Sequence, residues 1–166
     1  MSQEVTCPYC SKTAMRMTGL QLHPSRSDLR DKRYHVCRNC DAWVGCKDGT
    51  WEPLGRLANA ELRRAKQAAH AALEKIWSAA MQANQWTKSK ARNLAYSWLA
   101  SEMGLRYGEA NIGQFDLDQC RLVALICSYR EPNLAEICQQ REATAARRQG
   151  FQRRPGRGPR PGASPV

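Results

Sequence analysis

Two Cys-x-x-Cys pairs carry the clearest chemistry in this sequence: Cys7 with Cys10, and Cys37 with Cys40. Each pair can point two thiolates at one metal ion, and four sulfur ligands complete the tetrahedron that zinc adopts in closed structural sites. The 26 residues between the pairs exceed the roughly 15–20 residues common in such motifs. The sequence therefore predicts one structural Zn²⁺ ion, bound by these four cysteines, with a long loop between the pairs.

A catalytic role for this metal is not expected. Catalytic zinc keeps one coordination position open and commonly uses His or carboxylate ligands, whereas four cysteines close the site. The three histidines, His23, His35 and His70, form no His-x-Glu or His-Glu-x-x-His motif, and no Walker or Ser-nucleophile motif is present. We therefore expect no enzyme. A zinc-dependent nuclease or modifying enzyme is the least favoured alternative.

The other four cysteines are expected to be structural thiols. Cys120, Cys127 and Cys138 lie among apolar residues of predicted helices, and Cys46 follows the second pair, where it is a less favoured substitute ligand.

The sequence also bears on cellular location. No leader segment with a basic start and an apolar run precedes the cysteines, and no apolar run approaches the roughly 18 residues of a membrane span. These features predict a cytoplasmic protein with reduced thiols and no membrane partner.

Charge suggests a polyanionic partner. The chain of 166 residues has a net charge of +11 and a pI near 9.6. Residues 1–51 contribute +3, residues 52–101 contribute +5, and residues 102–146 contribute −3. The last twenty residues hold six arginines and no acid. Basic side chains therefore concentrate in the zinc module, in the first helices and in the tail.

These basic side chains are the candidate nucleic-acid contacts. They are Arg16, Arg30, Lys32, Arg33, Arg63, Arg64, Lys66, Lys88, Lys90, Arg92, Arg147, Arg148, Arg153, Arg154, Arg157 and Arg160. A tail that only increases solubility is the alternative for the last six. Trp77 and Trp98 are expected in the core, whereas Trp43 is the tryptophan to test for stacking on bases, although packing against the zinc module is favoured.

Short strands are expected to position the cysteine pairs. Residues 15–17 and 20–22 alternate around Thr18-Gly19 and predict a β-hairpin, residues 24–33 predict a loop, and further strands are expected at 34–37 and 42–44. Strands that lead into and out of paired Cys-x-x-Cys turns describe a zinc ribbon. We assign it to residues 1–51.

About four helices are expected to follow in residues 52–149. The first begins at the N-cap Asn59, and the second runs from Thr87 or Ser89 to Met103, before Gly104. The third begins at the Asp116-x-x-Gln119 capping box and is apolar nearly all round, which predicts burial on every side. The fourth begins at Glu131-Pro132. Residues 150–166, rich in Arg, Gly and Pro, predict a disordered basic tail. The fold class is therefore α+β: a zinc ribbon, a small helical bundle and a tail.

Several segments together resemble a known family. They are the Cys-Pro-Tyr-Cys motif at residues 7–10 and residues 34–46, 53–58, 61–63, 96–100 and 112–116. The combination resembles the DUF3268-like, zinc-finger-containing proteins of phages and prophages over residues 5–127. The family often has a His after the equivalent of Cys46, where this chain has Lys47. The resemblance implies a zinc-bearing bacterial or viral protein and implies no activity.

The leading hypothesis is a zinc-binding, non-enzymatic nucleic-acid-binding protein, with DNA slightly favoured over RNA. Its zinc ribbon and basic helices would position the molecule, and the arginine tail would add affinity without reading sequence. The alternative is a protein-interaction adaptor or inhibitor, in which the acidic block of residues 102–142 docks a host or phage protein and zinc is purely structural.

Overall fold

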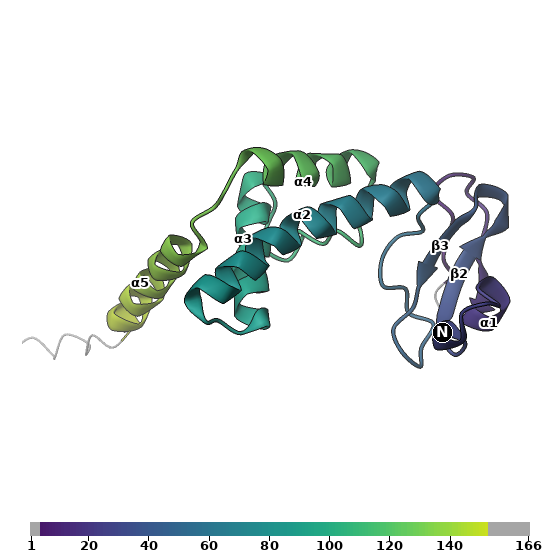
Figure 1. Cartoon of the computed structure of the whole chain (residues 1–166), viewed down its shortest axis with the longest axis horizontal. Coiled ribbons are helices and arrows are strands. Elements are labelled where there is room, and N and C mark those ends of the chain that lie inside the picture. The colour runs from purple at the N-terminus through teal and green to yellow at the C-terminus, as the bar shows by residue number, and fades with distance from the viewer. Residues whose placement is uncertain (1–3, 153–166) are drawn as a thin grey trace, which may run out of the picture.

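The computed structural model describes residues 4–152, with side chains described as far as Arg147, and carries a small sheet at one end and helices at the other (Figure 1). The elements are β1 (Met15–Thr18), α1 (Gly19–Leu22), a 3₁₀ turn (Ser27–Leu29), β2 (Arg33–Cys37), a second 3₁₀ turn (Arg38–Cys40), β3 (Ala42–Gly45), α2 (Ala60–Asn84), α3 (Lys88–Glu102), α4 (Leu117–Tyr129) and α5 (Leu134–Gln152). This arrangement confirms the predicted α+β fold class.

The sheet is antiparallel, and β2 is its central strand. His35 on β2 lies opposite Arg16 on β1 and opposite Val44 on β3. Because side chains alternate along a strand, the two faces of the sheet differ. One face packs Cys7, Ala14, Cys37, Ala42, Val44 and Leu57. The other packs Met17, Tyr34 and Val36 with Leu22 and Trp43.

The predicted hairpin over residues 15–22 is wrong. The backbone N–H of Thr18 donates to Oε1 of Gln21 over 2.8 Å, so a capping box starts the single turn α1 at Gly19. Strand β1 pairs instead with β2. Strands β2 and β3 lie where the sequence predicted strands. Gly19 is required here because a Cβ atom would lie 1.6 Å from the carbonyl oxygen of Leu29.

The caps of α2 and α3 confirm two sequence predictions. Oδ1 of Asn59 accepts a hydrogen bond from the Leu62 N–H over 2.9 Å, and Thr87 caps α3. The expected inner face of α2 is buried in a core that this helix shares with α3, α4 and α5. The buried residues of α2 are Leu62, Ala69, Leu73 and Trp77. Gly104 follows α3 with a φ of +65°, the left-handed conformation expected of a C-terminal glycine.

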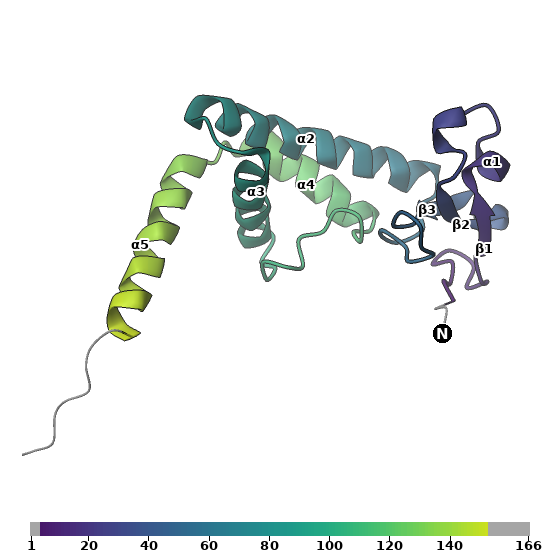
Figure 2. The same cartoon turned by 90° about the horizontal axis from the view of Figure 1, so that it is seen from below.

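Helix α4 is buried on one side only, which corrects the expectation that it is buried all round. Its predicted capping box at Asp116 is present, and α4 lies along α2 in both views (Figures 1 and 2). Leu122, Leu125 and Tyr129 are nevertheless 42%, 52% and 83% exposed. They lie on the side away from α2, where no other described element covers them.

Helix α5 differs from the prediction at both ends. It starts at Leu134 rather than at Glu131-Pro132, because Oδ1 of Asn133 accepts the N–H of Glu136 over 3.2 Å. It continues to Gln152, past the expected boundary at residue 149, and projects away from the other helices (Figure 2). The tail prediction for residues 153–166 lies outside the described residues. Among the described helices, none combines the length and the apolar character that crossing a bilayer requires.

A glycine contact joins the sheet end to the helical end. The N–H of Arg56 donates to the Gly113 carbonyl over 3.1 Å, and a Cβ atom on Gly55 would lie 2.2 Å from the same oxygen. Both partners are backbone atoms, so neither can move away cheaply. Gly55 therefore allows residues 53–58 to lie against the loop that precedes α4.

We expect Gly55→Ala to lower the free energy of unfolding by about 1–3 kcal/mol, the usual cost of an added methyl group in a packed site. Urea unfolding monitored by circular dichroism measures the change. Gly108→Ala is the matched control, because a Cβ atom there meets nothing within 4 Å. Equal unfolding midpoints for the two variants would contradict the proposed close approach.

Candidate metal centre

The four cysteines of the two pairs converge on one point. Their sulfur atoms all lie within 4.8 Å of one another, and Sγ of Cys10 lies 3.5 Å from Sγ of Cys37. Sulfur atoms bound tetrahedrally to zinc at about 2.3 Å would be about 3.8 Å apart. The donor set and its spacing therefore fit a single zinc ion, and the predicted ligands Cys7, Cys10, Cys37 and Cys40 are all brought together.

Both cysteine turns end in the same backbone conformation. The residue directly after each pair is left-handed, with φ of 58° at Ser11 and 45° at Asp41. The N–H of Ser11 donates to the Cys7 carbonyl over 2.9 Å, and the N–H of Asp41 donates to the Arg38 carbonyl over 3.5 Å. The chain is thus turned back twice with the same hand, which directs both pairs of thiols inward.

The environment of the thiols favours a bound cation. The backbone amide of Lys12 lowers the pKa of Cys10 to about 7, whereas contact with Cys10 raises the pKa of Cys40 to about 12. Four thiolates this close repel one another unless a metal ion compensates their charge. Cys7 and Cys37 are buried, Cys10 and Cys40 are partly buried, and four cysteines are a donor set found in closed zinc sites.

His35 and Cys46 lie outside the four-cysteine cluster. Nε2 of the buried His35 lies 2.8 Å from the Trp51 carbonyl, and its Nδ1 has no hydrogen-bond partner among the described residues. Burial raises the pKa of the Cys46 thiol, which keeps it protonated. Both residues support the sheet beside the cluster.

A three-stranded sheet that brings two cysteine turns to one tetrahedral site defines a zinc-finger protein. Residues 3–130 match DUF3268, described as a zinc-finger-containing domain. The match covers more than half of the chain, and the protein belongs to this family, as the sequence motifs suggested. Neither the curated proteins nor the solved structures contain a significant match to it.

The basic side chains of the ribbon gather partly around Trp51. The guanidinium carbons of Arg16 and Arg33 each lie 5.3 Å from the centre of its ring. Lys32, in contrast, pairs with Asp48 over 2.6 Å, and Arg30 is exposed. The sequence did not reveal the role of Trp51, because it follows β3 by several residues and meets the arginines only through the fold.

The basic side chains of α2 lie where this helix meets the sheet. Arg63 pairs with Asp41 over 3.1 Å, and its guanidinium lies 4.9 Å from the centre of the Trp43 ring. Nζ of Lys66 donates to the Gly113 carbonyl over 2.6 Å, and Arg64 is exposed. Asp41 directly follows a zinc ligand, so the metal site and α2 are linked by a short chain of contacts.

The basic side chains of α3 are not brought to the ribbon. Figure 1 shows α3 beginning at the end of α2 that is remote from the sheet. Each of its three basic side chains lies over an aromatic ring there: Lys88 over Trp77, Lys90 over Trp86, and Arg92 over Tyr96. Arg147 is exposed on α5. The side chain of Arg148 and residues Arg153, Arg154, Arg157 and Arg160 lie outside the described part.

Proposed function

We propose that the protein is a zinc-binding, non-enzymatic nucleic-acid-binding protein of phage or prophage type, with DNA favoured over RNA. The observation that carries this proposal is the convergence of Arg16 and Arg33 on Trp51. Neither guanidinium has an ion-pair partner among residues 4–147. Two cations near one ring, without a described carboxylate to compensate them, favour an anion nearby, and a phosphate group that contacts them would accept charge-assisted hydrogen bonds.

Zinc has a purely structural role in this proposal. Arg33 begins β2 and the ligand Cys37 ends it, so the metal fixes the strand that presents the arginine. Nη1 of Arg33 also donates to the Gly49 carbonyl over 2.5 Å, which holds the side chain beside Trp51. Such a contact binds phosphate without reading bases, so it contributes affinity rather than sequence specificity.

The double variant Arg16→Gln/Arg33→Gln tests the proposal. We expect weaker binding to duplex DNA, and a plot of log K against log salt that is less steep by about 1.8, or 0.9 for each lost phosphate contact. Fluorescence anisotropy across a salt series measures both quantities. Arg26→Gln is the matched control, because Arg26 already pairs with Asp28 over 2.7 Å.

The same assay with RNA tests the preference for DNA. A folded double variant that retains the full affinity and salt dependence would contradict the role of Trp51 and its arginines. Tighter binding to RNA than to DNA would contradict only the choice of nucleic acid. The absence of any binding at low salt would contradict the proposed function as a whole.

A second candidate function, a protein-interaction adaptor or inhibitor acting on a host or phage protein, is favoured by the exposed stripe on α4. Leu122, Leu125 and Tyr129 recur at helical spacing on the segment whose net charge is −3, which would repel nucleic acid. A stoichiometric protein partner that survives nuclease treatment and is lost in Leu125→Glu, without any nucleic-acid binding, would favour the adaptor.

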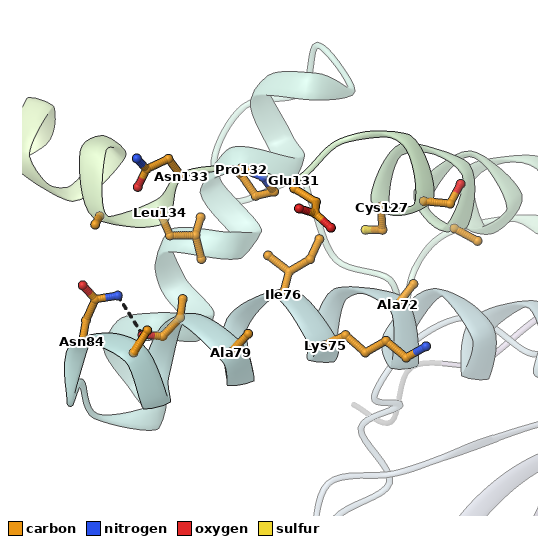
Figure 3. A pocket seen from close by; sticks show the side chains of 15 residues that line it. Ala72, Lys75, Ile76, Ala79, Asn84, Cys127, Glu131, Pro132, Asn133 and Leu134 are labelled. Carbon is orange, nitrogen blue, oxygen red and sulfur yellow. Dashed lines mark hydrogen bonds between the residues drawn. The ribbon is translucent and has the colours of Figure 1, made fainter.

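An apolar groove lies on the other side of α4, between it, α2 and the start of α5 (Figure 3). Its volume is about 580 Å³, and Ile76, Cys127 and Leu134 line it. Burial raises the pKa of Cys127 to about 11, so this thiol is protonated and unreactive, as expected of a core cysteine. For an adaptor, the groove would add to the exposed stripe on α4 a second apolar surface beside the acidic residues 102–142.

A further inference from the structure

A groove separates the edge strand β3 from the first turns of α2. Its volume is about 500 Å³, and its walls include Trp43, Leu54, Arg56, Arg63, Arg64 and Lys66. Within the described residues, the lining contains four cationic side chains and no carboxylate. The groove thus combines an apolar floor with a basic rim, whereas a site for phosphate alone would need only the cations.

The Trp43 ring is fixed from several sides. Tyr34 and His23 contact it edge-on, with ring centres 5.7 Å and 5.5 Å away. The Arg63 guanidinium lies over its face and is itself held by the Ala58 carbonyl at 2.8 Å, in addition to Asp41. A planar aromatic ligand can stack on such a fixed aromatic and guanidinium pair without ordering it first. Leu54, 58% exposed, adds apolar surface.

Lys66 supplies a positive charge that no described carboxylate neutralises. Its half-buried ammonium donates to the carbonyls of Gly113 and Arg56, at 2.6 Å and 3.3 Å, and has no ion-pair partner in the described chain. This burial removes part of the solvent from the charge and lowers the pKa of Lys66. An ammonium has three donors, so one remains for an anion. Arg56 and Arg64 line the same groove.

We propose that this groove binds a nucleotide of single-stranded nucleic acid, with its base against Trp43 and Leu54 and its phosphate against Lys66, Arg56 and Arg64. This inference rests on the proposed function and names the strand state that the protein selects. A duplex keeps its bases stacked on one another and offers the groove only phosphates. An unpaired base also uses the apolar floor, so we expect tighter binding of single strands.

The test compares the full-length, zinc-loaded protein on a labelled single-stranded DNA oligonucleotide and on the duplex of the same sequence. Trp43→Leu should weaken single-strand binding by about tenfold or more, because one stacked base is lost. Duplex binding should be nearly unchanged, because paired bases do not stack on Trp43. Trp43→Phe should restore most of the affinity. Trp86→Leu is the matched control, because Trp86 also carries a cation, Lys90 at 5.0 Å, but lies outside the groove.

A second variant keeps the test valid if Trp43→Leu fails to fold. Leu54→Glu changes an exposed side chain and places a carboxylate in the groove, so single-strand binding should fall at least as much. Equal affinity of the wild-type protein for single strand and duplex, or equal losses in Trp43→Leu and Trp86→Leu, would overturn the groove while leaving nucleic-acid binding in place. No binding to either strand state or to RNA would overturn both.

Discussion

Replacing Cys7 with Ser should unfold the zinc ribbon and abolish zinc binding. Zinc contributes about 10–16 kcal/mol to the folding of small finger modules. Whole domains have a free energy of unfolding of about 5–15 kcal/mol, so the ribbon has no reserve to replace the metal. Cys7 is fully buried among Ala14, Cys37 and Val44, and its loss also disturbs the packing of one face of the sheet.

Metal analysis and near-ultraviolet circular dichroism of the purified variant measure this effect. The wild-type protein should contain one zinc ion per chain, and the variant none. The helical content should largely remain, because the core that joins α2, α3, α4 and α5 contains no residue of the four-cysteine cluster. Cys127→Ser is the control and should keep its zinc. A Cys7→Ser protein with a full complement of zinc would contradict the assignment of this ligand.

Removing residues 147–166 should produce the second large effect, a loss of duplex affinity that depends on salt. The deletion removes six arginines and no acid. If all six contact phosphates, the slope of log K against log salt becomes less steep by on the order of 5, at about 0.9 for each contact. A slope of that size corresponds to about a thousandfold change in affinity between 50 and 200 mM salt.

A matched variant separates charge from length. Replacing the six arginines by lysines should retain most of the affinity, because phosphate contacts depend mainly on charge, whereas replacing them by glutamines should reproduce the deletion. The fold should tolerate every one of these changes, since the side chains of α5 are exposed from residue 139 onward as far as they are described. Unchanged affinity of the deletion variant at low salt would remove the tail from the binding surface.

The sequence predicted the features that are determined locally. The caps at Asn59, Thr87 and Asp116 each depend on a side chain within three residues of the backbone group it binds. The two cysteine turns are closed by backbone hydrogen bonds over three or four residues. These interactions are encoded in short motifs. They were therefore found at the right positions without knowledge of the rest of the fold.

Most of the features that failed depend on residues distant in sequence, but the hairpin over residues 15–22 failed for a local reason. The Thr18-x-x-Gln21 capping box, a motif readable in the sequence, ends the strand before a hairpin can form. Alternation marks β1 as a strand but does not say that its partner is β2. The outer face of α4 is apolar in sequence, but α2 covers only one side of it. Trp51 could not be assigned to Arg16 because a loop and two strand pairings bring them together.

The length of helix α2 sets the distance between the proposed groove and the cations of α3. About 20 residues separate Arg64 from the C-terminal end of α2 at Asn84, and at 1.5 Å per residue they span about 30 Å. If both the groove and the cations of α3 bind nucleic acid as proposed, a ligand shorter than this span can contact only one of them. A longer ligand can contact both, with a raised effective concentration at the second site, so we expect affinity to increase with ligand length beyond the gain from any single contact.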